Sequence, residues 1–224
     1  MAENRTLLLL RLEGLLQSWG EDAKWDYRGS GSMPTKSGII GLLACALGLE
    51  RGNPEIAALS ENVRITVRAD RPGLRMEDYQ TVTGAPLRNA EGKPRSTGNT
   101  FISKRVYLQD ASFLAVIEGE DALLVKLAAA LQSPRWCLFL GRKSCVPSRP
   151  VFEALTEDYS DAMDALRHYP LAERAKWPVS YETEQPFERL ASMQRPDERL
   201  DGGRSFALRR VWRGVIREED HVSY

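Results

Sequence analysis

The chain has 224 residues, of which 42% are hydrophobic and 28% are charged, a balance typical of soluble globular proteins rather than of disordered or membrane-embedded ones. Its 31 basic and 31 acidic residues cancel, which argues against a protein that finds nucleic acid through a global positive field. The charges are nevertheless divided, because residues 1–149 carry a net charge of +4 and residues 150–224 a net charge of −4. A polyanion is therefore expected to meet the N-terminal part.

The longest apolar run near a terminus, Leu7 to Leu10, is too short for a membrane span or a signal peptide. The three cysteines include no CxxC pair, and an odd number cannot all pair within the chain. We therefore expect a cytoplasmic protein with no membrane partner. No spacing of cysteine and histidine matches a zinc site, so neither a metal nor another cofactor is expected.

Hydrophobic periodicity predicts alternating strands and helices in the first 145 residues. Thr6–Leu12 is an almost unbroken apolar run, which favours a central strand covered on both faces. The apolar stripe of Thr35–Leu49 predicts a helix capped by Thr35 or Ser37, and the alternation of Asn62–Ala69 predicts a strand with one buried face. The later elements are a strand over 106–117, a helix over 121–131 and a short strand over 135–140.

This order is the βαββαβ arrangement of ferredoxin-like or RRM-type α+β domains, an antiparallel sheet backed by two helices. The connection between its second and third strands would run over residues 70–104, which is long for a hairpin, and segments 79–83 and 100–103 could pair as a projecting arm. Residues 1–149 would form this domain. Residues 150–224 would form a β-rich extension or subdomain, with helical segments in 158–174 and strands over 178–183 and 206–216.

Residue types that bind phosphate occur at two predicted turns. The turn from Gly141 to Ser144 places two cations beside backbone NH groups, without the full spacing of a nucleotide-triphosphate loop. An ordinary basic turn is the alternative interpretation of these residues. Lys36 and Ser37 at a predicted helix start form a second candidate anion seat, where simple helix capping explains the hydroxyls equally well. The aromatic residues that could stack on bases are Trp19, Trp25, Tyr27, Tyr79 and Tyr107. No RNP1 motif occurs, so loops and the arm would hold any RNA.

Five ordered segments resemble the CasD family, the RAMP-superfamily subunits of type I-E CRISPR Cascade complexes. These segments are RLEGLLQSWG at 11–20, PTKSGIIGLL at 34–43, DYQTVTGA at 78–85, YLQDASF at 107–113 and LGRKSC at 140–145. The resemblance implies a ferredoxin-like palm whose β-hairpin thumb is residues 70–104. It also implies a ribonucleoprotein subunit that caps the 5′ handle of the CRISPR RNA in antiviral defence.

The partners implied by this resemblance are the CRISPR RNA, the repeating CasC-type backbone subunit and the large PAM-reading CasA-type subunit. Target DNA would be met only through the complex. The RNA contacts that the resemblance implies are Gln17, Ser18, Trp19, Lys36, Ser37, Tyr79, Thr81, Arg88, Lys104, Arg105, Tyr107, Arg142 and Lys143.

Relatives in type I-C systems cut precursor RNA with a tyrosine and a lysine–histidine pair, whereas the histidines here are His168 and His221. We therefore predict a non-catalytic binding subunit. The alternative is a metal-independent endoribonuclease, and its candidate residues are Tyr27 or Tyr107 with Lys36 or Lys104. A domain that binds small molecules is disfavoured by the arm and the basic turns.

Overall fold

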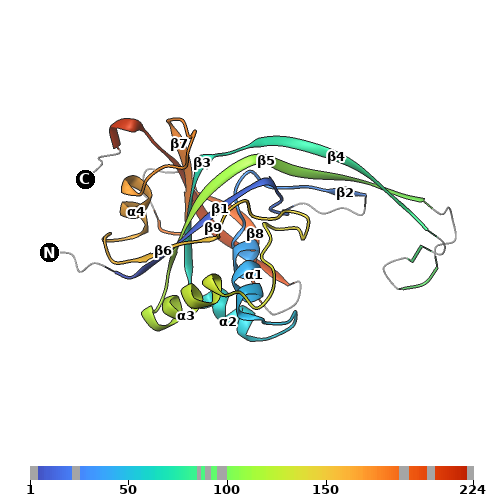
Figure 1. The fold of residues 1–224 in the computed structure, drawn as a ribbon, viewed down its shortest axis with the longest axis horizontal. Coiled ribbons are helices and arrows are strands. Elements are labelled where there is room, and N and C mark those ends of the chain that lie inside the picture. The colour runs from blue at the N-terminus through green and yellow to red at the C-terminus, as the bar shows by residue number, and fades with distance from the viewer. Residues whose placement is uncertain are drawn as a thin grey trace.

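The computed structural model describes residues 5–21, 26–84, 87–88, 92–94, 100–186, 192–200 and 205–220. Figure 1 shows a mixed α/β fold in which helices pack on a twisted sheet and a two-stranded ribbon projects from one end. In this part of the chain, no helix is both long and apolar enough to cross a membrane.

The sheet has the strand order β6-β1-β5-β3-β7-β9-β8, and neighbouring strands along this path are antiparallel. The strands are β1 (Leu7–Gln17), β3 (Arg64–Arg71), β5 (Thr100–Glu118), β6 (Phe152–Thr156), β7 (Val179–Thr183), β8 (Ser192–Arg199) and β9 (Phe206–Ile216). Strands β7 and β9 confirm the two strands predicted in the C-terminal part. Together with β8 they extend the sheet beyond β3, which was one of the two arrangements expected there.

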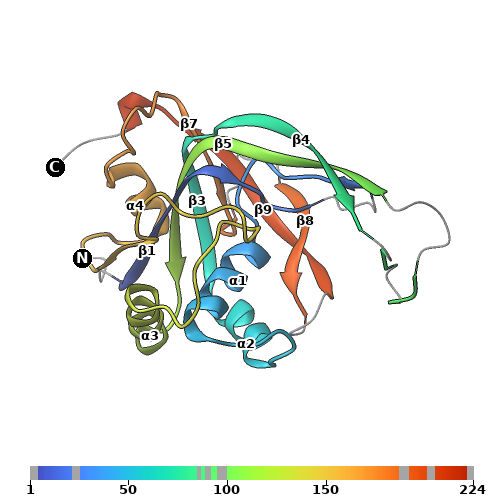
Figure 2. The ribbon, with the colours of Figure 1, turned by 45° about the vertical axis from the view of Figure 1, so that its right-hand side comes forward.

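The helices lie on both faces of this sheet (Figure 2). They are α1 (Lys36–Leu47), α2 (Glu55–Asn62), α3 (Asp121–Gln132) and α4 (Ala162–His168), and a 3₁₀ turn spans Glu218–Asp220. The predicted cap of α1 is confirmed, because the backbone NH of Gly38 donates to Thr35 Oγ1 (3.1 Å).

The two faces of β1 are both buried, as its apolar run predicts. Leu8 and Leu10 pack into the core formed with α1, α2 and α3, whereas Leu7 and Leu9 pack into a second core against α4. Because successive side chains of a strand point to opposite faces, this one run of leucines joins the two cores.

The prediction that β3 has one buried face is wrong. Arg68 is fully buried, and its guanidinium donates to Asp70 Oδ1 (2.5 Å) and to the carbonyl oxygens of Tyr169 (2.8 Å) and Pro170 (3.0 Å). The face expected in solvent is therefore covered by the segment that includes and follows α4. Asp70 makes this burial tolerable, because a buried arginine needs a carboxylate and further acceptors.

The predicted strand over 135–140 is also wrong. The backbone NH of Arg135 donates to Ala46 at the end of α1 (2.9 Å), and the carbonyl oxygen of Leu140 accepts from the NH of Ser18 (3.1 Å). These backbone groups are thus paired with α1 and a loop, while β6 occupies the place beside β1. A short apolar stretch does not by itself decide which partner its backbone will find.

The predicted pairing within the arm is confirmed. Strand β4 (Leu74–Thr83) pairs with the first half of β5, in a register that runs from Thr83 opposite Thr100 to Leu74 opposite Gln109. On the other edge of β5, the short β2 (Tyr27–Arg28) pairs in parallel with residues 104–105. One continuous strand therefore belongs to the central sheet in its second half and to the projecting ribbon in its first (Figure 1).

Candidate functional site

The loop after β1 is engaged inside the protein. Gln17 Nε2 donates to the carbonyl oxygens of Leu12 (3.0 Å) and Ala111 (2.8 Å), and Gln17 Oε1 accepts from Trp19 Nε1 (3.1 Å). The Trp19 ring is fully buried against α1, where a Cβ on Gly38 would lie 2.8 Å from it. In this structure Trp19 therefore presents no aromatic face to a base, and these side chains fix the shape of the loop.

The glycine turn, residues 141–145, packs directly against that loop. Gly141 has φ of +86°, and a Cβ at this position would overlap the carbonyl oxygen of Ser18. Ser18 in turn is buried, and its hydroxyl donates to the carbonyl oxygen of Val106 (3.2 Å). Only glycine permits both this φ and this contact, so the sequence of the turn sets how closely it approaches the loop.

Of the two cations in the turn, Arg142 binds backbone carbonyl groups of the protein and Lys143 is exposed. The Arg142 guanidinium donates to the carbonyl oxygens of Val106 (3.2 Å) and Arg28 (2.9 Å). It also lies 4.6 Å from the ring centroid of Tyr107, which is buried beneath it. Arg142 thus ties the turn to the base of the arm, and Lys143 is left facing solvent.

The predicted anion seat at the start of α1 is filled by the protein itself. The backbone NH of Lys36 donates to Asp197 Oδ2 (2.8 Å), so a carboxylate from β8 sits at the helix N-terminus. Lys36 Nζ forms ion pairs with Glu184 (3.2 Å) and Glu198 (2.9 Å), and the lysine is only 4% exposed. The prediction of an anion site at Lys36 and Ser37 is thus right in kind, but the anions that occupy it are carboxylates of the protein itself.

These contacts belong to a buried charge network. Asp197 accepts two hydrogen bonds from Arg209, each 2.8 Å long. Burial acts to raise the pKa of Asp197, but hydrogen bonds and charge from Arg209, with the charge of Arg195, hold that pKa below its usual value. At Glu184 burial prevails and raises the pKa, although Lys36 and Arg209 oppose the rise. The network fastens β8 and β9 to the N-terminus of α1.

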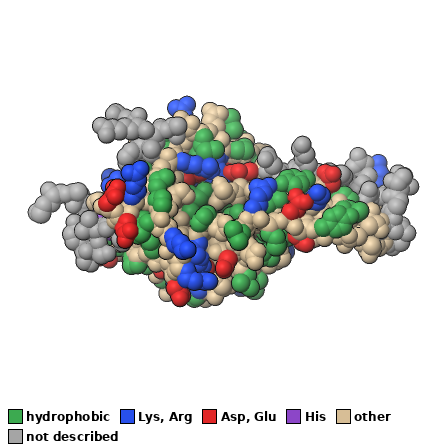
Figure 3. Space-filling model, turned by 90° about the horizontal axis from the view of Figure 1, so that it is seen from above, with side chains coloured by type: hydrophobic (Ala, Val, Ile, Leu, Met, Phe, Trp, Pro, Cys, Tyr) green, Lys and Arg blue, Asp and Glu red, His purple; other side chains and the backbone are tan. Residues whose placement is uncertain are grey.

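One face of the arm is open to solvent. Tyr79, which is 61% exposed, lies opposite Lys104 in the ribbon, and Thr81 lies opposite the exposed Ile102. Lys104 forms an ion pair with Glu77 (3.1 Å) on the same face. Figure 3 shows that the arm carries hydrophobic side chains beside basic and acidic ones, a surface suited to a mixed contact rather than to phosphate alone.

The other predicted contacts in and near the arm have partners within the chain. Arg105 Nε donates to Ser103 Oγ (3.3 Å), and Arg88 Nη1 donates to the carbonyl oxygen of Gly92 (2.7 Å). Trp25, one of the predicted stacking residues, lies outside the described residues.

Of the residues considered for RNA cleavage, Tyr27 and Lys104 are neighbours, whereas Tyr107 and Lys36 are held in other contacts. Tyr107 and Lys36 are each buried and engaged as described above. The Tyr27 hydroxyl accepts a hydrogen bond from Arg75 (2.8 Å), and Tyr27 lies beside Lys104 in the pairing of β2 with β5. The described part of the chain also places no group of three or more histidines, cysteines or carboxylates to hold a metal.

A pocket of about 430 Å³ lies between α1, the glycine turn and β8. Its cationic and aromatic lining residues are Arg51, Lys143, Arg199, Trp136 and Phe139. None of the described residues that line it is acidic. Of this lining, Ser37 and Lys143 were predicted RNA contacts. The sequence did not indicate Arg51, Trp136 or Arg199, because they come from separate segments with no shared motif.

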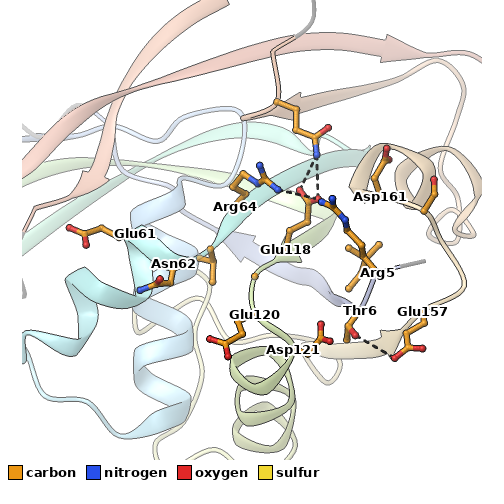
Figure 4. A pocket seen from close by; sticks show the side chains of 15 residues that line it. Arg5, Thr6, Glu61, Asn62, Arg64, Glu118, Glu120, Asp121, Glu157 and Asp161 are labelled. Carbon is orange, nitrogen blue, oxygen red and sulfur yellow. Dashed lines mark hydrogen bonds and ion pairs between the residues drawn. The ribbon is translucent and has the colours of Figure 1, made fainter. Parts of the chain in front are cut away.

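A second, larger groove of about 1360 Å³ lies at the opposite end of β5 from the arm (Figure 4). Its charged lining residues are Glu61, Glu118, Glu120, Asp121, Glu157, Asp161, Arg5 and Arg64. Arg64 Nη2 lies 3.9 Å from Glu118, so one of the two arginines is already paired with a carboxylate. This excess of negative charge repels a polyanion, which leaves the arm base and the smaller pocket as the candidate RNA surface.

The model of the CRISPR-associated protein family Cas_Cas5 matches residues 7–217. The chain belongs to the Cas5 family. It is 36% identical, over 179 residues, to the CRISPR system Cascade subunit CasD of Escherichia coli strain K12, an alignment that covers 74% of this chain and 77% of the relative. The resemblance drawn from the five sequence segments is therefore confirmed.

Two solved structures share the Cas5 chain's mixed α/β fold with its antiparallel sheet. One, described as a CRISPR RNA-guided surveillance complex, is 29% identical with a TM-score of 0.72, over 94% of this chain and 89% of the other. The second, a crystal structure of a Cas protein, is 33% identical with a TM-score of 0.74, over 97% and 98% of the two chains.

The contact of Gly141 with Ser18 can be tested by Gly141→Ala, with Gly52→Ala as a matched control. Both glycines have positive φ, but a Cβ at Gly52 meets no atom within 4 Å. The control should lose about 1–2 kcal/mol of unfolding free energy, the usual penalty for the left-handed conformation. Gly141→Ala should lose clearly more, because the Ser18 carbonyl must also move. Urea unfolding curves measure both losses, and equal losses would contradict the close contact.

Proposed function

We propose that this chain is a non-catalytic, cytoplasmic subunit of a type I-E Cascade complex that binds the 5′ handle of the CRISPR RNA. In this role it joins the CasC-type backbone to the CasA-type large subunit and meets target DNA only through the complex. The relative in Escherichia coli is named a Cascade subunit, and one similar structure is an RNA-guided complex. The observation that carries the proposal is the exposed Lys143, on a glycine turn that Arg142 joins to the base of the arm.

The topology supports a ferredoxin-like palm with a thumb. Strands β6, β1, β5 and β3 are neighbours in that order, and α1 and α3 lie in the connections between β1 and β3 and between β5 and β6. This is the strand order that a βαββαβ chain forms when each crossover is right-handed. The ribbon of β4 and β5 would then be the thumb.

In this proposal the predicted RNA contacts divide into two kinds. Lys143 neutralises a phosphate directly, and Tyr79 on the arm offers an exposed ring to a base or to the neighbouring subunit. The buried residues act by position: Trp19 shapes the loop, Lys36 fixes the start of α1, and Arg142 fixes the turn. Loss of a buried residue would change the surface without removing an RNA contact.

Lys143→Ala tests the binding role, with Lys126→Ala on the exposed side of α3 as control. A lysine that neutralises one phosphate of single-stranded RNA contributes about 0.7 to the slope of log affinity against log salt. We expect Lys143→Ala to weaken binding of a repeat-derived handle RNA and to reduce this slope by about 0.7, while Lys126→Ala changes neither. Fluorescence anisotropy over a salt series measures both quantities. An unaltered slope in Lys143→Ala would argue against this seat.

The absence of catalysis is tested with end-labelled repeat RNA. We expect no product beyond those formed without protein, with or without EDTA, because Tyr107 and Lys36 are buried and Lys104, the neighbour of Tyr27, is paired with Glu77. Denaturing gel electrophoresis after prolonged incubation is the measurement. A product that forms with the wild-type chain and is lost in Tyr27→Phe would establish the endoribonuclease instead.

The role of the arm is tested by replacing residues 81–102 with Asn-Gly, a two-residue hairpin turn. The remaining ribbon still pairs Gln80 with Ser103, so the palm should fold. We expect the shortened chain to unfold at a similar temperature but to fail to co-purify with the backbone subunit. The same complex carrying Lys126→Ala serves as control. If the complex assembles normally without the arm, the thumb does not join this chain to the backbone.

A further inference from the structure

Gly41 lines the pocket between α1 and the glycine turn, and the packing of the fold does not require a glycine there. Gly38 is required, because a Cβ there would lie 2.8 Å from both Thr35 Oγ1 and the Trp19 ring. One turn further along α1, a Cβ on Gly41 would meet only Arg199 Nη2, at an ordinary contact distance of 3.9 Å. A glycine within a helix costs about 0.5–1 kcal/mol relative to alanine, and its usual benefit is close approach of another group to the backbone.

Gly41 lines the pocket, so the missing side chain leaves open space there. The neighbouring walls are aromatic: Trp136 is 42% exposed, and Phe139 lies beside it in the irregular segment after α3. A flat ring that enters between α1 and this wall would contact apolar surface on both sides. The volume of about 430 Å³ also lies in the range of about 300–1,000 Å³ that is usual for small-molecule sites.

The described charged side chains that line the pocket are all cationic, which favours a negatively charged ligand. Arg51, Lys143 and Arg199 line it, and no carboxylate does among the described residues. Arg51 and Lys143 form no ion pair with any carboxylate of the described part, in contrast to Lys36, which has two. A ligand with one flat aromatic ring and one negative group would therefore match both the aromatic lining and the cations of the pocket.

We propose that this pocket takes one unstacked nucleotide of the bound RNA, with its base between α1 and the aromatic wall and its phosphate toward Lys143. The inference rests on the proposed RNA-binding function and adds a specific base-sized site to it. A free nucleotide offers the same ring and phosphate as a nucleotide of the RNA, and titration with AMP or UMP distinguishes the two ligands.

The test compares Gly41→Leu, which fills the pocket, with Gly41→Ala, which adds only a methyl group where space exists. Handle RNA is prepared with a single abasic site moved one position at a time, and affinities are measured by anisotropy with the full chain. One stacked base corresponds to about 5- to 150-fold in affinity. We expect Gly41→Leu to lose binding within this range and Gly41→Ala to lose little. One abasic position should weaken the wild type by a similar factor and leave Gly41→Leu unaffected.

Trp136→Ala serves as a second variant if Gly41→Leu fails to fold, since it removes a partly exposed ring from the wall. It should lose affinity for intact handle RNA, and the abasic substitution that weakens the wild type should leave its affinity unchanged. If either folded variant binds handle RNA as the wild type does, or if all abasic positions behave alike, the nucleotide pocket is wrong while the RNA-binding function stands. If the wild type itself does not bind handle RNA, the proposed function fails and the pocket assignment fails with it. If AMP or UMP binds the wild type but not Gly41→Leu, and RNA affinity is equal in both, the site serves a free nucleotide and the proposal is overturned.

Discussion

The arrangement around the site depends on the pairing of buried charge between the C-terminal strands and α1. Asp197 of β8 accepts from Arg209 of β9 and from the backbone NH of Lys36, so one carboxylate joins three elements. Breaking such a set by removing one partner leaves an uncompensated buried charge, which is strongly unfavourable. The C-terminal hairpin is therefore held against the start of α1, and this contact brings Arg199 to the pocket beside Gly41.

In the basic turn, Gly141 and Arg142 make the internal contacts and leave the charge of Lys143 exposed. Gly141 lets the turn contact the loop at Ser18, and Arg142 fixes its other side to β5 and β2. Both contacts are internal, so the turn is ordered before any ligand arrives. Lys143 is then presented at a defined position, and a preorganised charge loses less conformational entropy on binding than a mobile one.

Much of the secondary structure followed from periodicity. The leucine run of β1 and the apolar stripes of α1 and α3 each predicted their element correctly, because these patterns match a strand buried on both faces or the period of a helix. Strand β8 was missed because its inward side chains are Arg195 and Asp197, a pattern that looks like a solvent-exposed loop. Periodicity reports hydrophobic burial, and here the buried face is charged.

The sequence by itself determined the family, through five short segments, and most of the elements of the palm and its arm. It also marked Lys36 and Arg142 as anion-binding residue types, but it could not say whose anion or carbonyl they would meet. Only the tertiary structure decided that Asp197, 161 residues further along the chain, fills the seat at α1 and that Lys143 stays exposed. The reason is physical: which charges are buried together depends on contacts between distant segments, and local pattern carries no information about them.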